Sequence, residues 1–141
     1  MTKERLRQYR ELKNEKAQIE EKLEELEGVM YAPRGTNYEE KIREKYKTGS
    51  LTEVLHEQHE ALVNLYNAKL AELNALLLEI ETAVESLTDA TERRVVRLHY
   101  IDGMKWEAVA VAIGYEWAQT HRIHARALAK LRELEEVKNN G

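Results

Sequence analysis

The spacing of apolar residues between positions 63 and 87 constrains the fold of this chain more than any other feature. Apolar side chains recur there in an unbroken alternation of three- and four-residue steps, at Val63, Tyr66, Leu70, Leu73, Leu77, Ile80, Val84 and Leu87. Such steps return to one side of an α-helix. The pattern predicts a helix over residues 51–87, about 55 Å long. Leu62, Leu76 and Leu78 widen the apolar stripe, so we expect this helix to touch more than one partner.

A second seam of the same kind lies in residues 3–27. It consists of Tyr9, Leu12, Ile19, Leu23 and Leu26, with Lys16 filling one position. Gly28 follows as a predicted helix stop. The segment "YAPRGTN" (31–37) carries the strongest turn signal, so residues 28–50 are predicted to form a loop. Residues 1–87 are therefore expected to fold as a long antiparallel coiled-coil hairpin.

The composition agrees with helices and excludes several other classes. Charged residues make up 34% of the chain, there is one proline, and no strand-like run is bounded by turn signals, so we predict an all-α fold. Cysteine is absent, which excludes disulfides, thiolate metal sites and cysteine nucleophiles. We find no run of about 18 apolar residues and no apolar signal core. We expect no membrane partner and a cytoplasmic location.

Three short helices are predicted in residues 88–136, at 89–101, 105–113 and 116–136, followed by a tail at 137–141. Thr88 or Asp89 is the expected N-cap of the first. The breaks fall at Asp102–Gly103 and at Gly114. The second and third helices show the spacing of a helix-turn-helix, in which small Ala110 permits a close crossing and Gly114 supplies a positive φ. Three apolar residues would fill the angle between the helices, namely Val109, Ile113 and Ile123. The same spacing also fits helical hairpins with no role in DNA binding.

Positive charge gathers in this C-terminal part. The whole chain has a formal net charge of −4, but residues 91–132 hold eight Lys/Arg against four Asp/Glu, a net +4. A polyanion responds to charge within a Debye length of about 8–10 Å, so the local excess matters more than the total.

The segments "ERRVVRLHYIDGMKWEAVAVAIGY" and "THRIHARALAKLR" resemble region four of bacterial sigma factors, the domain that reads the promoter −35 element. The resemblance covers about 45 residues. "APRG" and "THRIHARAL", together with the predicted coiled coil, are also similar to small phage proteins of Gram-positive hosts, including late transcription regulators of the RinA and ArpU types. These likenesses imply a DNA-binding helix-turn-helix, a phage origin and a bacterial host cytoplasm.

The resemblance to sigma factors implies that base-facing positions fall at Trp117, Ala118, His121 and Arg122. Sigma factors usually carry polar or basic residues at the first of these, so Trp117 and Ala118 depart from the pattern. Glu116 also stands where a Ser or Thr N-cap is common. The departures put −35 specificity in doubt for this chain.

A helix beginning at residue 116 would turn its basic residues outward and Ile123, Ala127 and Leu131 inward. In a major groove, Arg122 can pair with guanine and Gln119 with adenine. Five further cations are placed for the DNA backbone: Arg126 and Lys130 on the same helix, and Arg93, Arg94 and Lys105 on the others. Arg97 is a further candidate. The alternative is a solvated basic helix face, and for Trp117 it is packing against the coiled coil.

The sequence lacks the ligand sets and motifs that metal binding and catalysis require. His56 and His59, and likewise His121 and His124, are spaced for metal binding, but neither pair has a third ligand nearby in the sequence. His99 and Tyr100 are expected to pack near Trp106, which we interpret as a core residue. Because neither histidine pair has a third ligand, we expect no metal site. Because the chain has no phosphate-binding glycine loop and no nucleophile elbow, we expect no enzyme activity and no cofactor.

Three hypotheses follow. In the first, the chain is a sequence-specific transcription regulator whose helix 116–132 enters the major groove of double-stranded DNA, and whose coiled coil forms a homodimer or contacts RNA polymerase. In the second, it is a small terminase-like DNA-packaging protein, although that class usually has its DNA-binding part first. In the third, it is a structural or adaptor protein whose helix-turn-helix serves only as a scaffold.

Overall fold

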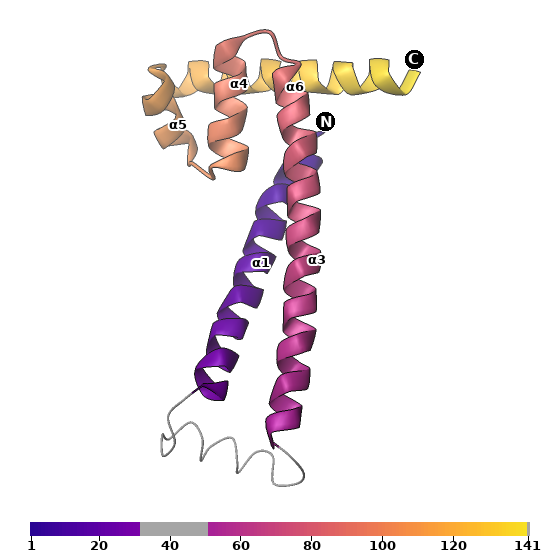
Figure 1. Ribbon diagram of the computed structural model, residues 1–141. Coiled ribbons are helices and arrows are strands. Elements are labelled where there is room, and N and C mark those ends of the chain that lie inside the picture. Colours follow the sequence, from indigo (N-terminus) through magenta and orange to yellow (C-terminus); the bar gives the residue numbers. More distant parts are fainter. Residues whose placement is uncertain (32–50, 141) are drawn as a thin grey trace. The chain divides into compact units, whose positions relative to one another are not determined.

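The computed structural model describes residues 1–31 and 51–140, and this part of the chain is helical, with no strand. The all-α prediction is confirmed. Figure 1 labels the α-helices; η1 is a π-helical turn that continues α4. The elements are α1 (Lys3–Met30), α3 (Leu51–Glu85), α4 (Ala90–Val96), η1 (Arg97–Ile101), α5 (Trp106–Ile113) and α6 (Trp117–Asn140). No helix in the described residues is long and apolar enough to cross a membrane.

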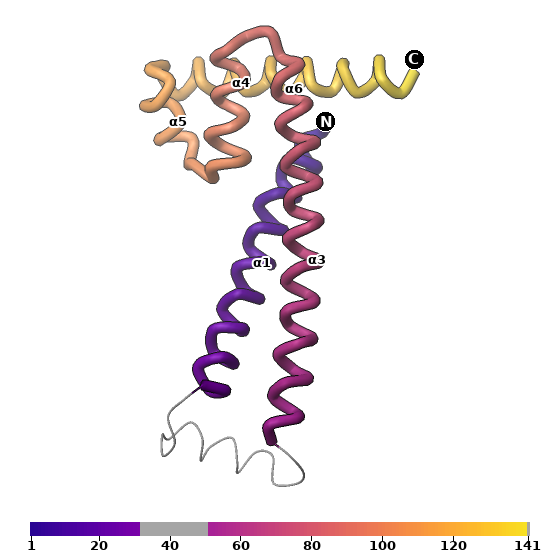
Figure 2. Tube along the Cα trace, viewed as in Figure 1, coloured from indigo at the N-terminus to yellow at the C-terminus, as the bar shows by residue number. Residues whose placement is uncertain are grey.

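The chain divides into two compact units. Unit 1 consists of residues 1–13 with 72–141, and unit 2 of residues 14–71. Helices α1 and α3 contribute residues to both units, whereas α4, η1, α5 and α6 belong entirely to unit 1. The path of these short C-terminal elements is easiest to follow in Figure 2.

Two predictions about the long helices are wrong. Helix α1 continues through Gly28 to Met30, because an isolated glycine weakens a helix by only about 1 kcal/mol and Gly28 keeps a negative φ. Residues 28–31 of the expected loop are therefore mostly helical, and the rest of that loop, including "APRG", lies outside the described residues. Leu78 was expected to widen the apolar stripe of α3, but it is 69% exposed.

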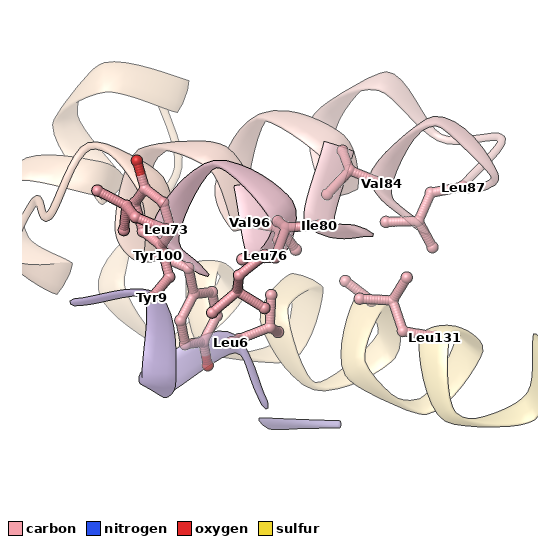
Figure 3. Packing of buried hydrophobic residues seen from close by; sticks show 11 residues of the cluster. Leu6, Tyr9, Leu73, Leu76, Ile80, Val84, Leu87, Val96, Tyr100 and Leu131 are labelled. Atoms are coloured by element: carbon pink, nitrogen blue, oxygen red, sulfur yellow. The ribbon is translucent and has the colours of Figure 1, made fainter. Parts of the chain in front are cut away.

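Unit 1 has a continuous apolar core (Figure 3). The first turns of α1, the C-terminal half of α3, α4 with η1, and α6 all contribute to it. Its buried members are Leu6, Tyr9, Leu73, Leu76, Ile80, Val84, Leu87, Val96, Tyr100, Ala127 and Leu131. The seam expected on α3 supplies Leu73, Ile80, Val84 and Leu87, as predicted. This core fixes α6 against the rest of unit 1.

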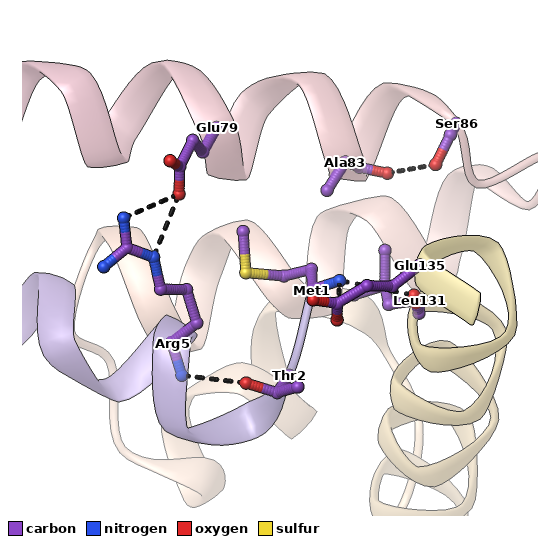
Figure 4. A network of polar contacts seen from close by, with 8 residues as sticks. All are labelled: Met1, Thr2, Arg5, Glu79, Ala83, Ser86, Leu131 and Glu135. Carbon is purple, nitrogen blue, oxygen red and sulfur yellow. Dashed lines mark hydrogen bonds and ion pairs between the residues drawn. The ribbon is translucent and has the colours of Figure 1, made fainter. Parts of the chain in front are cut away.

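Polar contacts reinforce unit 1 at the beginning of α1 (Figure 4). The amino group of Met1 donates to the carbonyl oxygen of Leu131 and to a carboxylate oxygen of Glu135, 2.6 Å away on α6. The guanidinium of Arg5 pairs with the carboxylate of Glu79 at 2.9 Å. The end of α3 is closed by the hydroxyl of Ser86, which donates to the carbonyl of Ala83.

Unit 2 pairs α1 with the first half of α3. An ion pair of 2.7 Å joins the carboxylate of Glu15 to the ammonium of Lys69, and the carboxylate of Glu27 lies 3.0 Å from Nε2 of His59. The later residue of α1, Glu27, pairs with the earlier residue of α3, His59. The two helices therefore run antiparallel within this unit. Their expected packing as a coiled coil remains a prediction.

The C-terminal helices begin and end close to the predicted residues. The Asp89 side chain caps α4 by accepting from the backbone amides of Thr91 and Glu92, which confirms one of the two expected N-caps. Gly103 and Gly114, at the two predicted breaks, have φ values of +73° and +75°. Helix α6 is longer than expected and continues to Asn140, so a separate tail from residue 137 is not found.

Candidate nucleic-acid interface

One side of α6 is buried and the other is open to solvent. The buried residues recur at steps of three and four, and are Thr120, Ile123, His124, Ala127 and Leu131. The inward positions predicted at Ile123, Ala127 and Leu131 are confirmed. The hydroxyl of Thr120 donates to the carbonyl of Glu116, so its polar atom is satisfied within the helix. Which side of α6 faces outward is therefore fixed by packing.

The turn between α5 and α6 depends on Gly114. Its amide donates to the carbonyls of Ala110 and Val111, and the amide of Tyr115 returns to Ala110. These bonds close α5 and turn the chain toward α6. A β-carbon on Gly114 would meet no atom within 4 Å, so the positive φ, rather than space, requires glycine.

A small apolar cluster holds α5, α6 and α4 together. Its buried members are Val95, Val109 and Ile123, and Ile113 packs against them. The three residues predicted to fill the angle between the helices therefore lie in one cluster. Short helices of this length need such tertiary contacts, because they are marginal in isolation.

An aromatic cluster beneath α6 contains two histidines that packing keeps neutral. The ring of His99 stacks on Trp106 at 3.9 Å between centroids, and burial lowers the pKa of His99. Nε2 of His124 and the Tyr100 hydroxyl form a 2.6 Å hydrogen bond, and burial lowers the pKa of His124 to about 4. Burial likewise raises the pKa of Tyr100 to about 12. The expected packing of His99 and Tyr100 near Trp106 is found, and His124 serves the core.

Trp117 lies at the first residue of α6 and is 57% exposed. Its ring contacts His121, with centroids 3.9 Å apart, and His121 in turn contacts Trp106 at 4.8 Å. Trp117 is thus not buried against the long helices, which was one of the two alternatives. The Nε2 atom of His121 is itself covered and has no hydrogen-bond partner among the described residues. His121 is therefore less open to a base than the other positions carried over from sigma factors.

Four of the predicted cations are exposed and available. They are Arg94 on α4, Lys105 before α5, and Arg122 and Arg126 on α6. Within the described part of the chain, none of them forms an ion pair with a carboxylate, although Arg126 lies near enough to Asp89 to favour its charged form. One Nη of Arg122 donates to the side-chain oxygen of Gln119 at 3.2 Å, so these two candidates act together. Ala118 beside them is also exposed.

Three other predicted cations are already engaged. The ammonium of Lys130 lies 2.9 Å from both carboxylate oxygens of Glu92, whose side chain is 1% exposed. Arg93 donates to the carbonyl of Leu87 and so closes the turn between α3 and α4. Arg97 bridges Glu81 and Glu85, and these bonds raise its pKa further. Because these contacts already occupy the three side chains, we base the candidate interface on the other four cations, and DNA contact by these three stays a prediction.

Two side-chain contacts that shape the site could not be predicted from the sequence. Glu92 is spaced like an ordinary first-turn acid, and nothing in its neighbourhood signals that it is buried beneath Lys130. The bond between Tyr100 and His124 joins residues 24 positions apart on different elements. Only the folded arrangement of η1 and α6 brings these two side chains together.

The histidine pairs His56/His59 and His121/His124 gather no third ligand from the part of the chain that the structure describes. Among the described residues, no three His, Cys, Asp or Glu side chains gather around a point where a metal could bind. His56 is exposed, and His59 is paired with Glu27.

The open side of α6 therefore offers guanidinium groups, an amide and apolar atoms on a rigid helix. Guanidinium groups suit phosphate oxygens and the guanine edge, and the amide suits the adenine edge.

No family model matches this chain, and no curated protein or solved structure matches it either.

Proposed function

We propose that residues 88–136 form a DNA-binding helix-turn-helix and that the protein is a sequence-specific transcription regulator of phage origin. Helix α6 enters the major groove of double-stranded DNA, and α5 crosses above it. The groove is about 12 Å wide and admits one helix. The resemblance to region four of sigma factors supports the regulatory role, and the likeness to small phage proteins supports the phage origin.

One observation supports this proposal most strongly. Helix α6 is buried on one side and carries exposed arginines on the other, among them Arg122 and Arg126, and neither of these two is paired with a carboxylate in the described residues. Two other arginines of unit 1 do form ion pairs, Arg5 with Glu79 and Arg97 with Glu81. Exposed arginines on a rigid support are what recognition of a polyanion requires.

The proposed contacts divide into two kinds. Arg122 and Gln119, which are bonded to each other, face the base edges. Arg126, Arg94 and Lys105 contact phosphates on either side of the groove. The carboxylate of Glu116, just before α6, interacts favourably with the helix dipole but would repel a phosphate. We therefore place Glu116 away from the DNA backbone.

The same proposal gives the long helices a role in assembly. The seam of unit 2 is only half-buried at Ile19, Leu23 and Leu26, and Leu65 of α3 is 53% exposed. Further apolar burial is thus open to a second copy of the chain or to RNA polymerase. Light scattering separates this proposal from DNA packaging, because a regulator gives a monomer or dimer and a packaging protein gives a ring of eight or more subunits.

The test is the affinity of the full chain for a 30-base-pair random duplex, measured by fluorescence anisotropy. Arg122→Ala combined with Arg126→Ala should weaken binding at least about tenfold, because each arginine contact is worth about 1–3 kcal/mol. The control is Lys22→Ala combined with Lys138→Ala, which removes the same charge from two exposed sites elsewhere. Equal affinities of the two double variants, with unchanged circular dichroism, would contradict the proposal.

A protein-binding scaffold is the second candidate, and one observation favours it. Val111, Tyr115 and Trp117 are large apolar residues that are 83%, 47% and 57% exposed around the turn between α5 and α6. Exposed apolar side chains of this size often mark a protein interface. Under this alternative, the arginine variants would leave DNA affinity unchanged, and substitution of the apolar residues would abolish binding to the partner protein.

A further inference from the structure

We propose that Trp117 and Ala118 contact the C5 methyl groups of thymine in the major groove, so that the protein selects thymine at the bases beneath the start of α6. This inference rests on the proposed DNA-binding function and specifies the class of sequence that it recognises. Ala118 has no hydrogen-bonding atom in its side chain, and the Trp117 indole has one donor, Nε1–H, on a largely apolar ring. Both side chains are therefore suited mainly to an apolar contact with a base.

The positions of the two residues support such a contact. Trp117 and Ala118 form the first turn of α6, and both are exposed. In a helix that lies in the major groove, the N-terminal residues are the ones that contact base edges. Ala118 precedes Arg122 by four residues, so the two share one side of α6, opposite the buried Ile123 and Ala127. Ala118 and the base-facing arginine therefore point in the same direction.

The charges around Trp117 favour DNA over a protein as the occupant. Arg122 and Arg126 follow it on α6, and Arg94 on α4 and Lys105 before α5 are exposed in the same unit; none of the four pairs with a carboxylate among the described residues. A protein covering this region would have to supply acids for all four. The DNA backbone supplies that charge on both sides of the groove, and the thymine methyl is the apolar group on the groove floor. One ligand thus satisfies both the cations and the apolar residues.

His121 acts as a positioning residue for Trp117. Its ring lies 3.9 Å from the Trp117 ring and 4.8 Å from that of Trp106, measured between centroids. Trp106 belongs to the cluster that joins α5 and α6, so the contact chain supports the exposed indole from the interior. An exposed tryptophan held in this way loses little side-chain freedom when it binds.

The experiment uses the full chain and begins with selection of bound sequences from a random duplex pool. The enriched duplex is then remade with deoxyuridine in place of thymidine, which removes only the methyl groups and keeps every base pair. We expect the wild-type protein to bind the uracil duplex about fourfold more weakly for each methyl group that it contacts. The Trp117→Ala variant should show a smaller preference for the thymine duplex, because only the Ala118 contact remains. Leu78→Ala, which removes an exposed leucine from α3, should keep the wild-type preference.

Each outcome decides a different point. Equal binding of both duplexes by the wild type, at an affinity that the arginine variants lower, would overturn the thymine contact and leave the proposed function standing. The same loss on uracil in wild type and Trp117→Ala would show that Trp117 contacts no thymine methyl and would overturn the inference for that residue. Absence of DNA binding by the wild type at low salt would overturn the proposed function together with the inference, and would favour a protein partner for Trp117.

Discussion

Units 1 and 2 use the same heptad-like spacing but are stabilised differently. In unit 1, the spacing leads to a deep core, in which six residues of α1 and α3 are at most 6% exposed: Leu6, Tyr9, Leu73, Leu76, Ile80 and Val84. In unit 2, Leu55 is the one apolar side chain classed as buried among the residues that the structure describes, and exposed ion pairs accompany a half-buried seam. Periodicity therefore identifies the helix but not the depth to which its apolar side is buried.

The largest expected contrast between the units comes from shortening a leucine in each. Leu131→Ala in unit 1 should lower the free energy of unfolding by about 2–5 kcal/mol, because it opens a cavity in a fully buried site. Leu70→Ala in unit 2 should cost about 1–2 kcal/mol, because that side chain is only half-buried and water can fill the space. Urea unfolding followed by circular dichroism measures both. Equal losses would show that unit 2 is covered by a partner in solution.

Acid should weaken unit 1 through His124. The folded pKa of about 4 lies below the ordinary value of 6.5, so the unfolded chain binds a proton at this site first as the pH falls. Stability is therefore complete above about pH 6.5 and declines by about 3 kcal/mol as the pH falls toward 4. Burial of His99 acts in the same direction. Unfolding measured between pH 7 and pH 4 should show this slope.

The matched variant for the acid effect is His124→Gln. Its amide oxygen can still accept from the Tyr100 hydroxyl, but it cannot bind a proton in this range. We expect the slope between pH 6.5 and 4 to become shallower, whatever the stability at pH 7. An unchanged slope would assign the acid sensitivity to other groups.

The smallest contrast concerns one lysine ion pair in each unit. Lys130→Met should cost about 2 kcal/mol, because it leaves the nearly inaccessible carboxylate of Glu92 without its partner. Lys69→Met should cost less than about 1 kcal/mol, since Glu15 remains half-exposed. Thermal unfolding compares the two. Adding Glu92→Gln to Lys130→Met should recover part of the loss, and a further loss would contradict this account of the pair.

Much of the fold could be predicted from local patterns, because those patterns act within one helix or turn. The Asp89 cap, the positive φ of Gly114 and the inward side of α6 are of this kind. The wrong predictions concern features that depend on tertiary contacts. Gly28 is carried within a helix, and Leu78 lies outside the core, although its neighbours resemble those of Leu77 in sequence.

The candidate site divides along the same boundary. The exposed positions of Arg122, Arg126 and Trp117 follow from their spacing against the buried residues of α6. The engagement of Lys130 could not be predicted, because its partner Glu92 lies 38 residues away on α4. Net charge counts both residues, whereas a DNA ligand would meet only the cations that the fold leaves unpaired.

The central claim is that exposed cations of unit 1 contact DNA phosphates, and the salt dependence of binding tests it most directly. With Arg94, Lys105 and Arg126 on phosphates, the logarithm of the association constant should fall against the logarithm of salt concentration with a slope of about −3, or roughly 40- to 60-fold between 50 and 200 mM. The double variant Arg122→Ala, Arg126→Ala should reduce the slope to about −2, and the Lys22→Ala, Lys138→Ala control should leave it unchanged. A slope near zero, or one that the two double variants change equally, would contradict the claim.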